Sequence, residues 1–196
     1  TPDIKPVWAS VVGIYEVNVR KYAYPGVGNW NDPDMLEVGN GSFTDSENRA
    51  HFSLWCMMNA PLILGNDIRK LLTADGTPGK NSETLRIISN RDAISINQDP
   101  LGVQCRRIKT NGFGDVLVKP LADGRLAVCL FNKGSSTQIL SFNVSEISDM
   151  EFISIPKTSK YKIKDVWEKY EFTSNGEVSE AVGKHSVKLY IIEAAE

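Results

Sequence analysis

The chain carries at residues 29–41 the stretch NWNDPDMLEVGNG, which places two carboxylates one residue apart between an aromatic residue and a glycine-rich turn. Side chains alternate with a period of two along an extended segment, so Asp32 and Asp34 are expected on the same side. Two like charges this close are costly unless hydrogen bonds or a partner charge stabilise them. The stretch therefore marks a candidate site in a loop at a strand end, with an Asx turn on Asn31-Asp32-Pro33 as the structural alternative.

Three separated motifs occur in the order of one known enzyme family. Residues 29–41 are followed by FSLW at 52–55 with APLI at 60–63, and then by NQDPLG at 97–102. Together these motifs resemble the second half of glycoside hydrolase family 27, the α-galactosidase family. The resemblance is strong over residues 1–105, and the remainder matches the family's C-terminal β domain by position only.

The resemblance implies an α/β fold followed by an all-β one: the C-terminal part of a (β/α)8 TIM barrel, then an antiparallel β-sandwich. Residues 1–102 would run from the end of barrel strand six to helix eight, and residues 103–196 would form the sandwich. Strand seven would end at Asp32–Met35 and strand eight at Leu62–Asp67. Because a complete eight-fold barrel needs roughly 250 residues, a chain of 196 residues is expected to lack an upstream half.

Apolar periodicity supports this division independently. Residues 7–19 and 44–58 carry helical apolar stripes, the second behind a capping-box pattern at Thr44–Glu47, and a third helix is predicted over 82–90. From about residue 103 the pattern changes to short runs, several of them alternating, that are separated by glycine-containing turns and are typical of an antiparallel sandwich. These runs lie at 125–131, 138–144, 162–167 and 185–192. Residues 97–100 are predicted to form the turn that joins the two parts.

Charge and cysteine content argue against several classes of protein. The 22 basic and 24 acidic residues give a net charge of −2, without a basic surplus for phosphates, so nucleic acid is not expected as a partner. No apolar run reaches the roughly 18 residues of a membrane span, and no membrane partner is expected. Cys56, Cys105 and Cys129 lack the spacing of a zinc site and are predicted to be buried free thiols. No metal and no cofactor is expected.

The resemblance assigns roles to three residues. The paired carboxylates of a retaining glycosidase lie roughly 5–5.5 Å apart on either side of the sugar, which residues one apart in sequence cannot do. The family pattern implies that Asp34 binds galactose hydroxyls, that Met35 lies beside the sugar, and that Asp32 is structural. It places the general acid/base at Asp3, within TPDI at residues 1–4, and an N-cap role for Asp3 is the structural alternative. The nucleophile, from strand four of the family's barrel, is not expected in this chain.

Other conspicuous residues are predicted to have ordinary structural roles. Trp30 and Trp55 are expected in the core rather than stacked on a sugar. His51 and His185 lack companions at metal-ligand spacing, so each is expected to be solvated or hydrogen-bonded. Calcium binding is an alternative, because hard oxygen ligands at alternating positions suit that ion. Its ligand set would be Asn31, Asp32, Asp34 and Glu37.

The predicted function is that of a retaining glycoside hydrolase releasing terminal α-linked galactose from galactosides, as the activity of the complete enzyme. Without the nucleophile, this chain alone is expected to be inactive. A non-catalytic carbohydrate-binding or structural β-sandwich module is the alternative from another class, and α-N-acetylgalactosaminides or β-L-arabinopyranosides are alternative substrates. Open strand edges at Leu36 and Leu62–Leu64 predict either self-association or association with an N-terminal half. The compartment stays open: cytoplasmic for a bacterial protein, secreted or lysosomal for a eukaryotic one.

Overall fold

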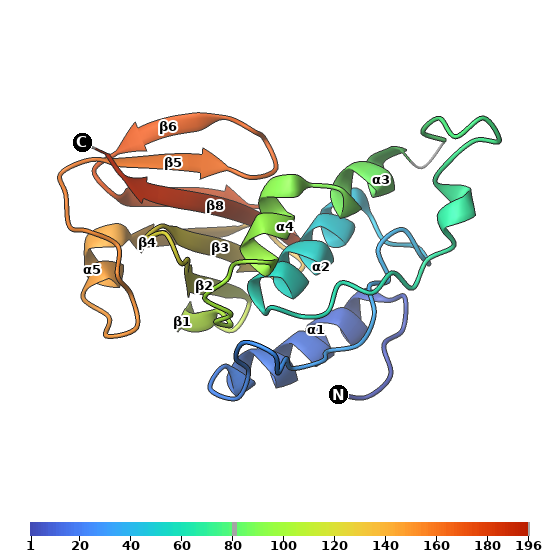
Figure 1. Ribbon diagram of the computed structural model, residues 1–196, viewed down its shortest axis with the longest axis horizontal. Coiled ribbons are helices and arrows are strands. Elements are labelled where there is room, and N and C mark those ends of the chain that lie inside the picture. The colour runs from blue at the N-terminus through green and yellow to red at the C-terminus, as the bar shows by residue number, and fades with distance from the viewer. Residues whose placement is uncertain (80–81, 196) are drawn as a thin grey trace.

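The computed structural model describes residues 1–79 and 82–195, which form three layers (Figure 1). The first layer contains helices and the loops between them. Its elements are α1 (Trp8–Asn18), η1 (Val19–Lys21), α2 (Asp45–Met57), η2 (Ile68–Lys70), α3 (Ser82–Ile88) and α4 (Arg91–Asn97). A six-stranded sheet forms the middle layer, and a two-stranded sheet with α5 (Val144–Ser148) covers its other face.

All strand pairs in both sheets are antiparallel, as a β-sandwich requires. The large sheet has the order β1-β2-β3-β8-β5-β6, and the small sheet pairs β4 with β7. The bounds are β1 Arg106–Thr110, β2 Gly114–Pro120, β3 Leu126–Asn132, β4 Gln138–Asn143, β5 Tyr161–Asp165, β6 Glu171–Ser174, β7 Glu177–Val182 and β8 Ser186–Ala194. The four predicted runs correspond to β3, β4, β5 and β8, whereas β1, β2, β6 and β7 were not predicted.

The large sheet is buried on both faces. All seven residues of β2 and all seven of β3 are buried. On β3, alternate side chains belong to two different cores: Ala127, Cys129 and Phe131 pack under the helices, and Leu126, Val128 and Leu130 pack toward the small sheet. The helix-side core therefore contains residues from both sides of the predicted domain boundary at 102/103. The position of that boundary stays a prediction.

The barrel part contains two segments that pair in parallel through Leu36 and Leu64. The Leu36 N–H donates to the Ile63 carbonyl at 2.8 Å, and the Gly65 N–H donates to the Leu36 carbonyl at 2.9 Å. Because α2 lies between these segments in sequence, they form the β-α-β arrangement predicted for strands seven and eight. The paired Leu36 lies one residue beyond the predicted end of strand seven at Asp32–Met35.

The N-terminus of α2 has the predicted capping box. The Glu47 N–H donates to Thr44 Oγ1 at 3.2 Å, and the Thr44 N–H donates to Glu47 Oε2 at 2.8 Å. These reciprocal bonds satisfy two donors at the helix end. The capping box fixes where α2 starts and therefore which of its side chains face the loop before it.

The third predicted helix, over 82–90, corresponds to α3, and a further helix, α4, follows it and was not predicted. Helix α3 ends at Ile88, and Asn90 is the N-cap of α4 rather than the end of α3. The Asn90 side chain accepts the N–H groups of Asp92 and Ala93, at 3.1 and 3.2 Å. The predicted turn at 97–100 consequently begins only after α4 has ended at Asn97.

Two predictions of burial are wrong. Leu36 is fully buried in the helix-side core, whereas exposed apolar surface at a strand edge open on one side was expected there. Ile63 and Leu64 are 53% and 40% exposed, as expected. Trp30 is 42% exposed and lies outside the core, whereas Trp55 is fully buried as predicted.

The three cysteines are buried free thiols, which confirms the prediction made for them. Within the described ranges, no helix has the length and apolar character needed to cross a membrane.

A buried ionic network joins α1 to the large sheet. Asp115 on β2 is fully buried and accepts hydrogen bonds from Tyr15 Oη and Lys133 Nζ, both at 2.8 Å, and from Arg107 Nη1 at 3.2 Å. Glu16 binds the same two cations, Arg107 at 2.9 Å and Lys133 at 2.5 Å. Burial opposes ionisation of Asp115, but the hydrogen bonds from Lys133 and Tyr15 outweigh it and hold the pKa of Asp115 below its ordinary value. Two carboxylates and two cations thus neutralise each other between the layers.

We predict that Asp115→Ala lowers the free energy of unfolding by about 3–5 kcal/mol, because it removes the fully buried counter-charge of two cations and leaves them to share the partly exposed Glu16. Urea unfolding followed by tryptophan fluorescence measures this loss. The control is Asp123→Ala, which removes a half-exposed pair with Arg125 and should change the free energy by less than about 1 kcal/mol. Equal effects of the two substitutions would contradict the structural role given to the network.

Candidate active site

Asp34 lies in a sharply turned loop just before the Leu36–Leu64 pair. Its N–H donates to Asp32 Oδ1 at 2.8 Å, which closes an Asx turn over Asp32-Pro33-Asp34, one residue later than the turn considered from the sequence. Its φ is 82°, in a left-handed region that costs a residue with a side chain roughly 1–2 kcal/mol, although Asp tolerates it better than most. The backbone is therefore not extended at Asp34, so the premise of simple alternation between Asp32 and Asp34 is wrong.

The carboxylate of Asp34 is held by two backbone donors from different parts of the chain. The Met35 N–H donates to Oδ1 at 2.7 Å, and the Ile4 N–H donates to Oδ2 at 2.8 Å. The second bond places the segment that carries Asp3 directly beside the loop that carries Asp34, across 30 positions of sequence. The structure therefore brings the predicted site segments together.

Asp3 does not cap a helix. The N-cap of α1 is Val7, so the structural alternative for Asp3 is wrong. Asp3 is exposed, and its carboxylate accepts no hydrogen bond from residues 1–79 or 82–195. A carboxylate without a protein hydrogen-bond partner, on a segment that is bonded to the loop of Asp34, is free to exchange a proton with a bound molecule.

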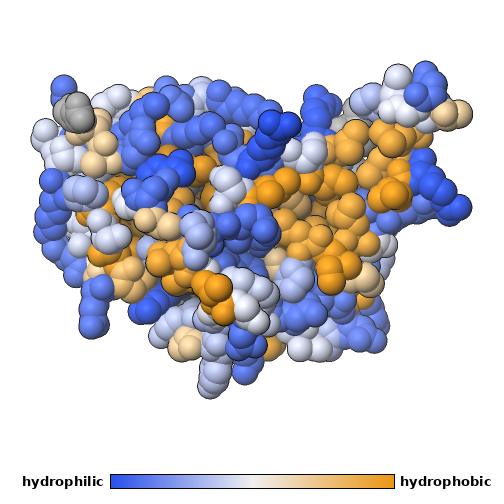
Figure 2. All heavy atoms as spheres, in the orientation of Figure 1, coloured by the Kyte–Doolittle hydropathy of each residue, from blue (hydrophilic) through white to orange (hydrophobic). Residues whose placement is uncertain are grey.

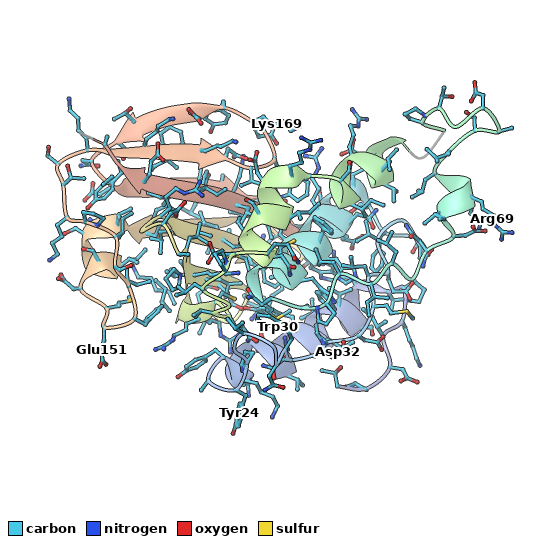
Figure 3. All side chains as sticks on the ribbon, in the orientation of Figure 1. Tyr24, Trp30, Asp32, Arg69, Glu151 and Lys169 are labelled. Atoms are coloured by element: carbon cyan, nitrogen blue, oxygen red, sulfur yellow. The ribbon has the colours of Figure 1, made fainter. Side chains whose placement is uncertain are left out.

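Met35, the third predicted site residue, follows Asp34 and is 41% exposed. Asp34 itself is half-buried. A fixed carboxylate and an exposed apolar side chain are thus adjacent at the surface, the pairing of polar and apolar contacts that a sugar ring requires. Trp30 and Asp32, labelled in Figure 3, lie on the loop that leads to them.

One face of α2 binds the main chain of the site loop, and this feature was not predicted. The residues Asn48, His51 and Trp55, here called the α2 polar face, are spaced three and four apart and so lie on one side of the helix. That spacing of three hydrogen-bonding side chains along one side of the helix was the available signal. The bonds join Trp55 Nε1 to the Asp34 carbonyl at 2.8 Å, His51 Nε2 to the Glu37 N–H at 2.9 Å, and Asn48 Oδ1 to the Gly39 N–H at 2.8 Å.

Both histidines are hydrogen-bonded, as predicted. His51 Nε2 accepts a hydrogen bond, which requires the neutral ring, and complete burial lowers the pKa of His51 to about 3. His185 Nδ1 lies 2.7 Å from Glu47 Oε1 and its ring stacks on Trp8 at 4.7 Å between centroids. The two histidines therefore join elements of the fold rather than bind a metal.

The residues of the calcium alternative have other partners. Asn31 Nδ2 donates to the Lys21 carbonyl and to Gln104 Oε1, each at 3.0 Å, and Glu37 Oε2 accepts from Asn40 Nδ2 at 2.6 Å. Within the described ranges, no three His, Cys, Asp or Glu side chains come together as a metal ion would need. The alternative ligand set is not assembled.

A pocket of about 370 Å³ lies elsewhere, between Trp30, the residues after α2 and the turn that follows α4. Its lining contains Val27, Trp30, Asn59, Ala60, Pro61 and residues 97–100. Asp3, Asp34 and Met35 are not among these lining residues. The predicted site is an open surface here, because only two paired barrel segments border it, whereas eight strands enclose the site of a complete barrel.

The comparisons with known proteins agree along the whole chain. Residues 1–99 match the family model described as Alpha galactosidase A, and residues 111–192 match the model described as Alpha galactosidase C-terminal beta sandwich domain. The chain is 38% identical to alpha-galactosidase 3 of Arabidopsis thaliana, over 98% of this chain and 42% of that protein.

Solved structures give the same result. Alpha-galactosidase I from Mortierella vinacea is 29% identical, with a TM-score of 0.82 over 95% of this chain and 45% of that chain. A β-L-arabinopyranosidase from Geobacillus stearothermophilus shares the fold, with a TM-score of 0.83 over 100% of this chain and 44% of that chain at 21% identity. The chain spans less than half the length of these relatives.

The buried neutral His51 predicts a pH-dependent stability. An unfolded histidine titrates near pH 6.5, while the pKa of His51 in the fold is about 3, so the unfolded state binds more protons between these values. The free energy of unfolding should fall by up to about 1.4 kcal/mol for each pH unit below pH 6.5. Urea unfolding at pH 7, 6 and 5 measures the slope, and His51→Gln, which cannot titrate, should flatten it. A profile unaltered in His51→Gln would contradict this assignment.

Proposed function

Because the chain belongs to glycoside hydrolase family 27, the α-galactosidase family, we propose that it forms part of a retaining glycosidase that releases terminal α-linked galactose. The observation that carries the proposal is the 2.8 Å hydrogen bond from the Ile4 N–H to Asp34. It holds the segment of Asp3, an unpartnered carboxylate, against the loop of the substrate-binding candidate. The proposal therefore combines a shared family with an arrangement of acidic groups that suits glycoside chemistry.

We assign Asp3 the role of general acid/base. In a retaining mechanism, a carboxylate attacks the anomeric carbon while a carboxylic acid protonates the departing glycosidic oxygen. Asp3 would give that proton. Its carboxylate would then take a proton from water as the water attacks the same carbon, which cleaves the glycosyl ester, releases the sugar and regenerates the attacking carboxylate. Its exposure suits a group that must meet both the leaving oxygen and water. The attacking carboxylate would come from a barrel unit outside this chain.

Asp34 suits substrate binding better than attack. Each of its oxygens already accepts one backbone N–H, which fixes the carboxylate plane and leaves lone pairs for sugar hydroxyls. Hydrogen bonds from hydroxyl groups to an ionised carboxylate are stronger than those to a neutral acceptor. Met35 would supply the apolar contact beside the ring.

The surface next to this site suits the remaining barrel units as a partner, joined to this chain or separate. The Leu64 N–H and carbonyl make no backbone hydrogen bond to any part of the chain that the structure describes, because Leu36 bonds to Ile63 and Gly65 instead. Figure 2 shows a broad hydrophobic area over the segment between α2 and η2. Ile63 and Leu64 in this segment, Ile68 in η2 and Leu72 just after it are each at least 40% exposed. A parallel strand of a further barrel unit would satisfy the free edge and cover this area.

The isolated 196-residue chain is expected not to hydrolyse an aryl α-galactoside, and addition of a polypeptide carrying the remaining barrel units is expected to restore hydrolysis. In the restored enzyme, Asp3→Asn should lower kcat by roughly 10²–10⁴ because proton transfer is lost. Asp34→Ala should act mainly on KM. Asp149→Asn, in an exposed pair with Lys157, is the matched control and should leave both constants unchanged.

The same assay separates the alternatives. Aryl α-N-acetylgalactosaminides and β-L-arabinopyranosides, tested in parallel, establish which glycoside is preferred. Galactose binding by calorimetry that Asp34→Ala abolishes, without hydrolysis in the restored enzyme, would favour a carbohydrate-binding module. Hydrolysis by the isolated chain would refute the claim that the nucleophile comes from outside this chain. A full kcat in Asp3→Asn would refute the assignment of Asp3 as the general acid/base.

A further inference from the structure

Helix α2 holds segment 34–39 through three side-chain hydrogen bonds to its main chain, and Asn66 Nδ2 donates a fourth to the Val38 carbonyl at 2.9 Å. The parallel pairing of the segment involves only Leu36, whereas the α2 polar face bonds to the main chain at three further positions. Each of these bonds reaches a backbone N–H or carbonyl. They therefore fix the path of the segment independently of its side chains.

The α2 polar face is costly to bury, which argues that its polar atoms have a specific task. Asn48 is 4% exposed, and His51 and Trp55 are fully buried. His51 Nδ1 is a buried atom without a hydrogen-bond partner in the described residues, and such an atom disfavours folding. A leucine would fill this position without that penalty. What histidine adds is the acceptor at Nε2, which receives the Glu37 N–H.

The bonds from Trp55 and His51 hold the main chain at a strained residue and three residues after it. Asp34 has a φ of 82°, and a side chain holds such a conformation only where the surroundings over-determine it. Trp55 binds the Asp34 carbonyl directly, and His51 binds the Glu37 N–H three residues later. The two rings also support each other, with centroids 4.1 Å apart and planes at 86°.

We propose that His51 and Trp55 are positioning residues, which brace the backbone at Asp34 so that its carboxylate stays directed at the segment of Asp3. This inference rests on the proposed role of Asp34 in substrate binding. Neither ring has to touch the sugar. Their effect reaches the site through the main chain of residues 34–37.

Kinetics of the restored enzyme test the consequence for Asp34. His51→Leu removes the acceptor, and Trp55→Phe removes the donor but keeps an aromatic ring. Each should raise KM for an aryl α-galactoside by about 3–10-fold, the equivalent of one hydrogen bond, with a smaller change in kcat. His51→Gln, which again offers an acceptor, should recover most of the KM. The control Leu54→Ala, a fully buried residue of the same helix, should lower Tm and leave KM unchanged.

Amide hydrogen exchange in the 196-residue chain tests the bracing without any activity. The Glu37 amide should exchange roughly tenfold faster in His51→Leu than in Leu54→Ala at matched global stability, as expected for loss of about one hydrogen bond. Equal exchange in these two variants, or faster exchange with an unchanged KM, would overturn the proposal. If neither the unaltered restored enzyme nor any variant hydrolyses a glycoside, the proposed function is refuted. The hydrogen-exchange result then decides by itself whether His51 and Trp55 hold the backbone at residues 34–37.

Discussion

The large sheet is covered on both faces, and most of the fold depends on this constraint. Its helix side completes the core beneath α1 and α2, while its other side forms the core of the sandwich. The neutral network around Asp115 fixes α1 on the sheet at one end of this contact. The position of α1 in turn determines where the preceding segment with Asp3 can lie. The sandwich therefore contributes to the site without supplying any of its proposed residues.

The sequence was sufficient to predict those parts of the fold whose signal is local or carried by family motifs. The capping box at Thr44–Glu47, the parallel segments around Leu36 and Leu64, and four of the strands were all predicted. The other strands were not predicted, because their sequence patterns are less regular. Strand β2 buries Asp115 and Lys119, so its apolar pattern is interrupted by charges whose partners lie far away in sequence. Strand β6 has four residues, none of them buried, and β7 buries only Val178 and Val182 among polar or small neighbours.

The residues of the candidate site were predicted from the sequence, but the contacts that hold them in place were not. The motifs identified Asp3, Asp34 and Met35, and the hydrogen bond from Ile4 shows that the first two segments meet. The left-handed conformation of Asp34 and the bonds from the α2 polar face depend on tertiary contacts, which alternation and periodicity do not describe. Trp30 was placed in the core because aromatic residues in apolar segments usually are, yet it lines an open pocket.

The two-sided burial of β2 and β3 has a consequence for recombination among relatives. A chimera that took everything after residue 102 from a relative would place that relative's β3 side chains against the helices of this chain. Cys129 and Phe131 fill space against residues of α1 and α2, so a donor with different volumes at these positions would leave voids or clashes there. A crossover at this point would therefore divide the helix-side core between two parent proteins. The odd-numbered positions of β3 would have to come from the same parent as the helices.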